Sequence, residues 1–451
     1  MIDVRAHILP NGCKVLLRPT PDKAILSIVA VVRWGARDDP ADQAGLSHLM
    51  ARLLTKGTGS RTAFEIAQTL ESVGGDIEAF CGQDFLGLET QTVETDWRIA
   101  LDVLTDCLFH STFRTGEFEK ERSLVQAEIR RAEDDKFSFT YRRLECLFYR
   151  GHLYGAPAEG EVETVASLDR ESVHALHAAI ARPQSVVLVV VGNVPDDEFL
   201  AAVAKTWPAG PVRPAGSPPE KDQVVRRRLE PEQAPGAGRG ETVVLTKEVE
   251  QGFVVLGYPA ERPGRPESAA LRLACGVLGE GMSARLFSRL RDRDHLAYAV
   301  GSSLVGRELA SHLFLYIGTN PATVEIARDR MRREAENLAD EPPDDAELER
   351  ARQYILGKYL IARQTNAALA RSMATTEIWG LGWEWGEHFP ERIKAVAPDQ
   401  VVSAARRYLN NPAAAVLVPS RGFAPGPATP KGAKSRAHRT RFPAPRRPIF
   451  A

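Results

Sequence analysis

One short segment of the chain has the spacing of a metal-binding helix but lacks part of its ligand set. Residues 45–58 read GLSHLMARLLTKGT, in which Ala51 and Arg52 follow His48 by three and four places. Side chains four places apart share one face of a helix, so two histidines there can hold a zinc ion while an intervening glutamate acts on bound water. Ala51 and Arg52 stand where that glutamate and the second histidine belong. The segment therefore predicts a helix that has lost its metal chemistry.

The surrounding pattern predicts the elements that would position this helix. Strands are expected near 3–8, 13–18, 25–35, 76–82, 84–92 and 185–193, and helices near 43–56, 62–73, 95–110, 115–148 and 169–181. Strands precede helices, and strict β-α-β alternation is rare. This order indicates an α+β fold in which helices cover an antiparallel-rich sheet.

The chain looks like two copies of one unit. ETVASLDRESV (163–173) and ERIKAVAPDQV (391–401) share a pattern, and each precedes an amphipathic helix, a proline and an apolar run. We predict an N-terminal domain, a Pro/Gly-rich linker, a C-terminal domain and a basic Pro-rich tail that is disordered. The expected boundaries are 1–207, 208–240, 241–419 and 420–451.

The composition is that of an ordinary globular protein, with 451 residues, 43% of them hydrophobic and 26% charged. The net charge of −1 includes eight Lys or Arg in the tail, so the remainder is negative, which argues against nucleic-acid binding. No apolar run approaches the roughly 18 residues of a membrane span, and the start shows no secretory signal. The five scattered cysteines predict reduced thiols and a cytoplasmic location.

Taken together, these residues resemble the pitrilysin/insulinase family of inverted-zincin metallopeptidases, and within it the half-length, two-chain members related to mitochondrial processing peptidase. The likeness rests on Gly45, His48, the Lys56-Gly57-Thr58 sequence and the Val73-Gly74-Gly75 turn. It implies two homologous pitrilysin-like (metallohydrolase-like) domains in this chain. It also implies that two chains together form a clamshell around the substrate.

The resemblance also implies a third zinc ligand, a glutamate on a later helix with another glutamate seven residues before it. Glu128 and Glu121 stand at these positions. Catalytic zinc takes three protein ligands and a water, whereas this chain offers His48 and Glu128. The Arg52 guanidinium repels a divalent ion and is expected to pair with Glu128. We therefore expect a vestigial site of His48, Ala51, Arg52, Glu121 and Glu128, with no metal in this chain. Without the helix motif, both glutamates would be ordinary carboxylates of a charged helix.

In the second half, residues 279–303 are similar to the family's helix-to-strand segment that carries an arginine and a tyrosine. Arg291 and Tyr298 have the matching spacing. The family implies that this pair faces the zinc site across a closed chamber. There the tyrosine hydroxyl donates to the oxyanion of the intermediate, and the arginine holds a neighbouring substrate carbonyl. The alternative interpretation is a solvated helix charge and a half-buried strand aromatic.

Two further features admit more than one interpretation. Gly276, Gly279 and Gly281 resemble a glycine-containing loop that is tied to substrate handling in the non-catalytic mitochondrial subunit, but a turn between helices accounts for them equally well. Strand 76–82 could pair with an extended peptide. Glu78 stands where the family usually has an asparagine, which puts that peptide binding in doubt.

These features predict a non-catalytic, zinc-lacking subunit of a heterodimeric zinc metalloendopeptidase. A homologous partner chain with an intact His-x-x-Glu-His would hold the zinc, and Arg291 and Tyr298 would act in trans. The substrate would be a peptide or a small unfolded protein. One alternative is a structural or peptide-binding scaffold of the same fold, and another is a residual zinc metallopeptidase.

Overall fold

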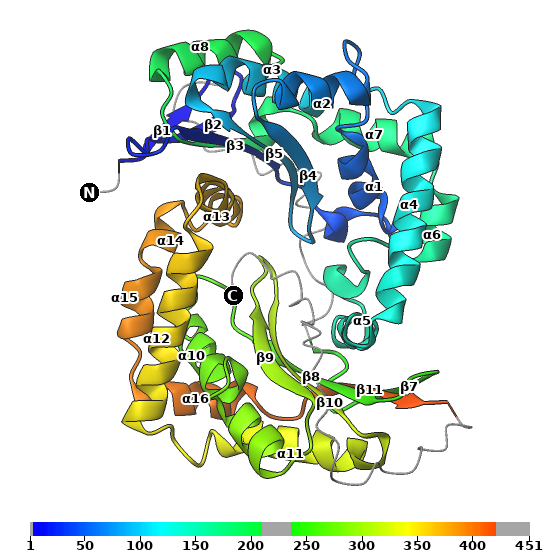
Figure 1. Ribbon diagram of the computed structural model, residues 1–451, viewed down its shortest axis with the longest axis vertical. Coiled ribbons are helices and arrows are strands. Elements are labelled where there is room, and N and C mark those ends of the chain that lie inside the picture. Colours follow the sequence, from blue (N-terminus) through cyan, green and yellow to red (C-terminus); the bar gives the residue numbers. More distant parts are fainter. Residues whose placement is uncertain (1–2, 210–235, 421–451) are drawn as a thin grey trace, which may run out of the picture. The chain divides into compact units, whose positions relative to one another are not determined.

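The computed structural model describes residues 3–209 and 236–420. Most of the predicted linker and nearly all of the predicted tail, at 210–235 and 421–451, lie outside the described residues. The described residues form two compact units, each built from one sheet and its helices (Figure 1). The predicted α+β class, with helices covering two sheets, is confirmed.

The sheet of unit 1 has six strands in the order β1-β2-β6-β3-β5-β4, and only the β2/β6 pair is parallel. Its strands are β1 (Arg5–Ile8), β2 (Lys14–Arg18), β3 (Ile25–Val32), β4 (Asp76–Cys81), β5 (Leu86–Val93) and β6 (Val186–Val191). The middle of the sheet is apolar on both faces. In β3, Ile28 and Ala30 belong to one core and Val29 and Val31 to another, because successive side chains point to opposite faces.

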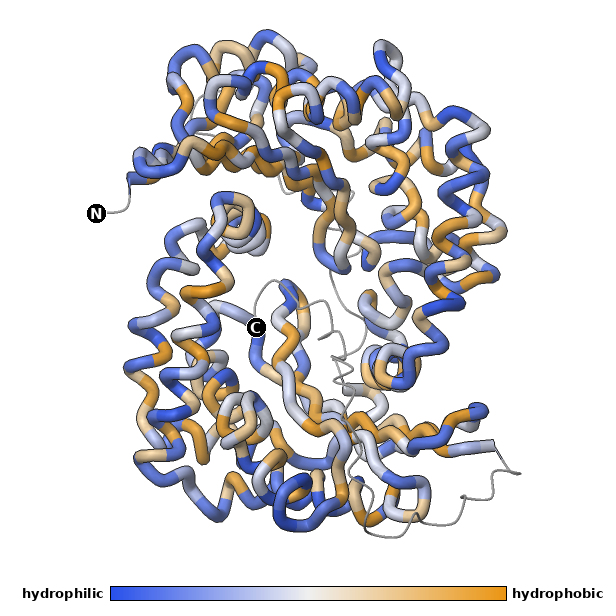
Figure 2. The backbone as a smooth tube through the Cα atoms, viewed as in Figure 1, coloured by the Kyte–Doolittle hydropathy of each residue, from blue (hydrophilic) through white to orange (hydrophobic). Residues whose placement is uncertain are grey.

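Helices cover both faces of this sheet. Those of unit 1 are α1 (Leu46–Leu53), α2 (Ala63–Glu71), α3 (Trp97–Phe109), α4 (Thr115–Asp134), α6 (Val162–Ser167), α7 (Arg170–Ile180), α8 (Asp196–Thr206), α13 (Asn366–Ile378), α14 (Glu384–Glu387) and α15 (Phe389–Lys394). Figure 1 shows α3 and α8 over one face and α13 against the other. Ala370, Met373 and Ala374 of α13 pack on the apolar face of β3 and β6. Figure 2 shows the resulting concentration of hydrophobic residues in the strands.

The sheet of unit 2 has the order β7-β11-β8-β10-β9, with β7 and β11 parallel. Its strands are β7 (Thr242–Lys247), β8 (Gly252–Ala260), β9 (Ala299–Val305), β10 (Ser311–Thr319) and β11 (Ala413–Pro419), and its helices are α5 (Lys136–Phe148), α10 (Ser268–Gly279), α11 (Val324–Asn337) and α16 (Pro398–Tyr408). Helix α12 (Asp345–Ala362) begins in unit 2 and ends in unit 1. In both units a parallel pair lies next to antiparallel strands, which agrees with two copies of one unit.

The two units exchange helices. Unit 1 includes Leu356–Lys394 from the second half of the chain, and unit 2 includes Asp135–Phe148 from the first half. The rings of Phe137 on α5 and Phe253 on β8 lie 5.9 Å apart, while Val324 of α11 packs on the opposite face of β8, at Gly252. The predicted domains were continuous in sequence, whereas each unit takes one segment from the other half.

The prediction of one helix over 115–148 was wrong, because the helix ends at Asp134 and a new helix begins at Lys136. The Asp135 carboxylate accepts a hydrogen bond of 2.8 Å from the N–H of Ser138. An aspartate that satisfies a free N–H in this way is a helix N-cap. The cap starts α5 as a separate element, and α5 then packs in unit 2.

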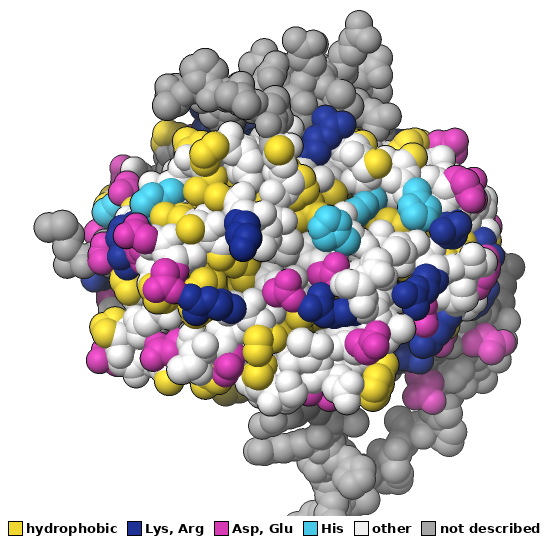
Figure 3. Space-filling view, turned by 90° about the horizontal axis from the view of Figure 1, so that it is seen from above, with side chains coloured by type: hydrophobic (Ala, Val, Ile, Leu, Met, Phe, Trp, Pro, Cys, Tyr) yellow, Lys and Arg dark blue, Asp and Glu magenta, His cyan; other side chains and the backbone are white. Residues whose placement is uncertain are grey.

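Charged side chains are mixed on the outer helical layer of unit 1. Figure 3, seen from the side of α3 and α8, shows acidic and basic groups interspersed among apolar ones. Arg61 on this side of the unit binds both Asp102 and Asp106 of α3.

Among the described residues, no helix combines the length and apolar character that a bilayer crossing requires.

Candidate functional site

Helix α1 carries the altered metal motif. Gly45, just before it, has φ of 97°, and a Cβ there would lie 2.7 Å from the carbonyl oxygen of Glu159, so only glycine fits without strain. Leu49 is fully buried. The apolar side of α1 packs in the core of unit 1, and His48 and Arg52 lie on the side that meets α4.

A partly buried carboxylate fixes the start of α1. The N–H of Ser47 donates to Asp39 Oδ2 at 3.0 Å, and the Ser47 hydroxyl also donates to Asp39. Trp34 Nε1 donates to Ser47 Oγ at 3.0 Å. Burial disfavours the charged form and raises the pKa of Asp39 to about 7, although the hydrogen bonds from Ser47 and Gly45 oppose this shift.

Arg52 joins two carboxylates of α4. Its Nε donates to Glu121 Oε2 at 2.9 Å, and its Nη1 lies 2.9 and 2.8 Å from the two carboxylate oxygens of Glu128. Glu121 and Glu128 are seven residues apart, two helical turns, and therefore lie on one face of α4. Lys56 Nζ lies 3.3 Å from Glu121 Oε1. The ion pair expected between Arg52 and Glu128 is present, and Glu121 and Lys56 extend it.

The cluster is anchored by a buried charge. The Glu121 side chain is only 2% exposed, whereas those of Arg52 and Glu128 are 26% and 49% exposed. Burial disfavours the guanidinium, but the hydrogen bond to Glu121 and the charges of Glu121 and Glu128 outweigh that effect and raise the pKa of Arg52. Arg52 is therefore charged at neutral pH.

His48 is the residue of the metal motif that this helix keeps. Burial lowers its pKa, and the Arg52 charge acts in the same direction, while Glu159 and Glu128 oppose the shift. The imidazole is therefore neutral at neutral pH. Its Nε2 is buried and has no hydrogen-bond partner in the described part of the chain.

The side chains at this site do not match the requirements of a catalytic zinc, which needs three protein ligands and a water. His48 offers one nitrogen, and both oxygens of Glu128 are bound to Arg52. Within residues 3–209 and 236–420, no three His, Cys, Asp or Glu side chains are grouped as metal ligands would be. Ala51 provides no carboxylate to take a proton from water.

Arg291 and Tyr298 lie in unit 2, on the segment that enters the edge strand β9. Arg291 belongs to the π-helix η6 (Phe287–Arg293), and its guanidinium carbon lies 4.6 Å from the centroid of the Phe287 ring. The Tyr298 side chain is 57% exposed, and its backbone N–H donates to Gly318 O at 2.8 Å. Neither side chain forms a hydrogen bond or ion pair with the residues that the structure describes. Both are therefore available to a ligand.

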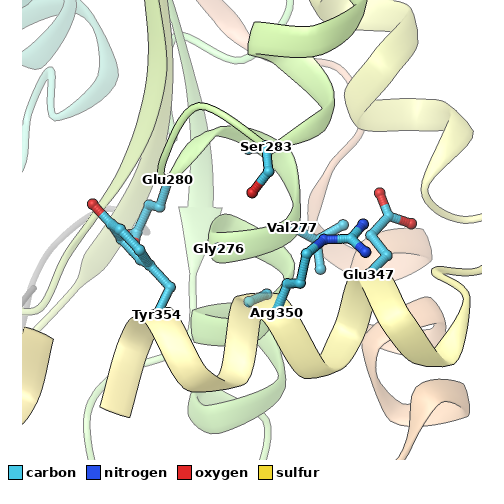
Figure 4. Close-up of a pocket in the computed structure, with 9 residues that line it drawn as sticks. Gly276, Val277, Glu280, Ser283, Glu347, Arg350 and Tyr354 are labelled. Carbon is cyan, nitrogen blue, oxygen red and sulfur yellow. The ribbon is translucent and has the colours of Figure 1, made fainter. Parts of the chain in front are cut away.

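The glycine-containing segment has a packing explanation. A Cβ on Gly279 would lie 2.5 Å from the backbone nitrogen of Ser302 in β9, and Gly281 has φ of 101°. Figure 4 shows the small pocket beside it, with Glu280 and Ser283 on the loop after α10 and Arg350 and Tyr354 on α12. Close approach of α10 to β9 and a tight turn account for these two glycines.

Sequence reasoning did not assign the roles of Lys56 and Asp39. Lys56 follows Arg52 by four residues, and two cations at that spacing opposite two glutamates of another helix are the signal for a shared ion cluster. Asp39 has no comparable signal, because its burial depends on the tertiary fold.

Strand β4 lies at the edge of its sheet, as a strand that pairs with an added peptide must, and Glu78 is exposed on it.

Two family models match most of the chain. "Insulinase (Peptidase family M16)" matches residues 14–160, and "Peptidase M16 inactive domain" matches residues 167–355. The "Uncharacterized zinc protease YmxG" of Bacillus subtilis (strain 168) is 26% identical over 423 residues, which covers 94% of this chain and 100% of the relative. The "Uncharacterized zinc protease SCO5738" of Streptomyces coelicolor is 27% identical and covers 92% of this chain and 90% of its own length.

Solved structures have the same fold. A protease from Helicobacter pylori matches with a TM-score of 0.82 at 19% identity, over 93% of this chain and 100% of that one. A peptidase M16 inactive domain from Pseudomonas fluorescens matches with a TM-score of 0.81 at 18% identity, over 93% and 99%.

Replacing Arg52 with alanine tests the ion cluster. The variant leaves the buried Glu121 with Lys56 alone, so we expect the free energy of unfolding to fall by about 1–3 kcal/mol, because an uncompensated buried charge is unfavourable. Arg332→Ala is the matched control, since it breaks a pair with Glu336 in which neither side chain is fully buried (39% and 36% exposed), and it should change stability by less than about 0.5 kcal/mol. Equal losses in chemical denaturation would contradict a special role for the Glu121 pairing.

Asp39 should make stability depend on pH. Its pKa rises from 3.8 in the unfolded chain to about 7 in the folded one. Between these values the folded chain holds a proton that the unfolded chain has lost, so raising the pH favours unfolding by about 1.4 kcal/mol per unit. The unfolding free energy of the wild type minus that of Asp39→Asn should therefore fall from pH 4 to 7 and level off above. A difference that stays constant over this range would be inconsistent with a protonated Asp39 in the folded chain.

Proposed function

Because the chain belongs to the insulinase (M16) family of peptidases, we propose that it is the non-catalytic subunit of a two-chain zinc endopeptidase. Its partner would be a homologous chain that carries an intact His-x-x-Glu-His. The substrate would be a peptide or a small unfolded protein. Zinc in the partner would activate the attacking water, and this chain would bind and orient the substrate.

The observation that carries the proposal is the binding of Arg52 to both glutamates of α4. A fixed guanidinium beside Glu128 repels a divalent ion and occupies both carboxylate oxygens. Loss of the base at Ala51 removes a contribution of roughly 10²–10⁴ to the rate, even for a chain that bound metal. The proposal therefore assigns the metal chemistry to another polypeptide.

Arg291 and Tyr298 are the groups that this chain would contribute. Both are exposed on a segment at the edge of the sheet of unit 2, and neither side chain forms a hydrogen bond or ion pair with a described residue. A tyrosine hydroxyl can donate to the oxyanion that forms at the scissile carbonyl. The forked donors of an arginine can hold a neighbouring carbonyl of the same peptide.

The names of similar proteins include both zinc proteases and an inactive domain, and the proposal combines one chain of each kind. The relative from Bacillus subtilis is named a zinc protease, and the structural neighbour from Pseudomonas fluorescens an inactive domain. A pair that consists of one zinc-bearing and one zinc-free chain reconciles the two descriptions. Both names describe those proteins, and the assignment to this chain rests on Arg52.

Zinc content tests the metal part of the proposal. Purified alone after incubation with zinc and removal of the excess, the chain should retain less than about 0.1 zinc per molecule, because two ligands without a third bind weakly. The double variant Ala51→Glu, Arg52→His restores the motif beside His48 and Glu128, and should retain close to one zinc by mass spectrometry. Stoichiometric zinc in the wild-type chain, with cleavage that a chelator abolishes, would instead identify a residual zinc peptidase.

Turnover by the reconstituted pair tests the role of Tyr298. The chain is co-purified from its native host with the homologous zinc-bearing chain, and cleavage of a quenched fluorescent peptide is followed. Tyr298→Phe should lower kcat by about 10²–10³ without weakening assembly, because it removes one oxyanion donor. Tyr408→Phe is the control, since it removes a tyrosine hydroxyl that binds Glu261 and Glu267 elsewhere in unit 2.

The outcomes separate the competing functions. Equal turnover in wild type and Tyr298→Phe would remove the contribution in trans. A stable pair that cleaves no peptide would favour a structural or peptide-binding scaffold. Failure to isolate any homologous partner would refute the two-chain enzyme.

A further inference from the structure

His295 has a backbone conformation that glycine adopts more easily. Within residues 3–209 and 236–420, positive φ occurs at three non-glycine residues, Phe113 (46°), His295 (53°) and Asn411 (47°). The short polar side chain of asparagine can hydrogen-bond locally in this region, and the ring of Phe113 packs against those of His174 and His177. His295 is exposed, so burial of its ring does not offset the unfavourable conformation.

The position of His295 is one at which helices usually place glycine. The N–H of Asp294 donates to Arg289 O at 3.0 Å, and the N–H of Leu296 donates to Leu290 O at 2.8 Å. His295 therefore lies between the last two hydrogen-bond donors at the end of the π-helix. A left-handed residue at such a helix end is most often glycine. The imidazole has no hydrogen bond, ion pair or ring contact with any described residue. Nothing in that part of the chain therefore explains a histidine here.

The neighbours of His295 indicate what kind of ligand it would meet. Arg291 and Tyr298, four residues before it and three after it, are also exposed, and neither side chain forms a hydrogen bond or ion pair with a described residue. Arginine donates only, and tyrosine and histidine donate readily. Of the two acids on this segment, Asp294 binds Arg293 at 2.9 Å and Asp292 is exposed. Unpartnered donors outnumber acceptors, so the segment suits a ligand rich in acceptors.

We propose that His295 is a specificity-determining residue that binds a side-chain carboxylate of the peptide. The carboxylate would belong to an aspartate or glutamate of the peptide. That residue would lie close to the two backbone carbonyls that Arg291 and Tyr298 bind. The inference rests on the proposed function to the extent that the same segment must bind peptide. A hydrogen bond from imidazole to a carboxylate is charge-assisted, and glutamine offers a similar shape without the charge. Comparing glutamate with glutamine therefore isolates the contact.

The test measures peptide binding to the isolated full-length chain by fluorescence anisotropy. Its probes are short fluorescein-labelled peptides of Ala, Ser and Leu with one Glu at successive positions, each with a Gln counterpart. At one or two positions the wild type should bind the Glu peptide about three- to tenfold more tightly, the range expected for a partly screened charge-assisted hydrogen bond. In His295→Gly the preference should vanish, while the thermal midpoint should be unchanged or higher because strain is relieved.

Asn411→Gly provides the matched control, because it removes the side chain of another positive-φ residue in unit 2 and should leave the preference intact. Equal preference in wild type and His295→Gly, the absence of any preference, or the absence of peptide binding would each overturn the inference. The measurement needs neither zinc nor partner. A Glu preference that depends on His295, found together with unchanged turnover in Tyr298→Phe, would support the inference while contradicting catalysis in trans.

Discussion

A carboxylate that is buried as deeply as Glu121 must be neutralised, and the way this chain does so determines what its first site can do. Arg52 and Lys56 supply the positive charge from the protein itself, and Arg52 also takes both oxygens of Glu128. Desolvating a charge is unfavourable unless a partner compensates it, so the cluster holds α1 and α4 together. The same pairing leaves His48 as a neutral imidazole whose Nε2 has no hydrogen-bond partner among the described residues. Helices α1 and α4, which carry the positions of a metal site, are thus held together by an ion cluster instead.

The second organising constraint is that both sheets are apolar on both faces. In unit 1 one face is covered by helices of the first half of the chain and the other by α13 from the second half. In unit 2 the corresponding role belongs to α5, which the first half contributes. Each unit is therefore incomplete without a helix from the other half. The repeated motif indicates two copies of one unit, and each copy includes a helical segment from the other half of the chain.

Much of this architecture could be predicted from the sequence, because its signals are local. The apolar run of Ile25–Val32 and the periodicity of Trp97–Phe109 each depend on residues within one element. The pairing of Arg52 with Glu128 could be predicted because the resemblance to the family implies that these two positions lie close together. The break at Asp135 was missed because no proline or glycine marks it in the charged stretch 130–136, and the surface that α5 covers lies in unit 2. The raised pKa of Asp39 and the positive φ of His295 arise from tertiary burial and helix closure, which no local pattern reports.

The exchange of α13 has a consequence for biosynthesis. All strands of the first sheet have been translated once Val191 leaves the ribosome, but the helix that covers Val29, Val31 and Val189 follows only at Asn366–Ile378. Until then a broad apolar face of a nearly complete sheet stays open to water, a state prone to aggregation. We therefore expect the nascent chain to be prone to aggregation at this stage, and neither half of the chain, divided at the connecting segment, contains a complete unit.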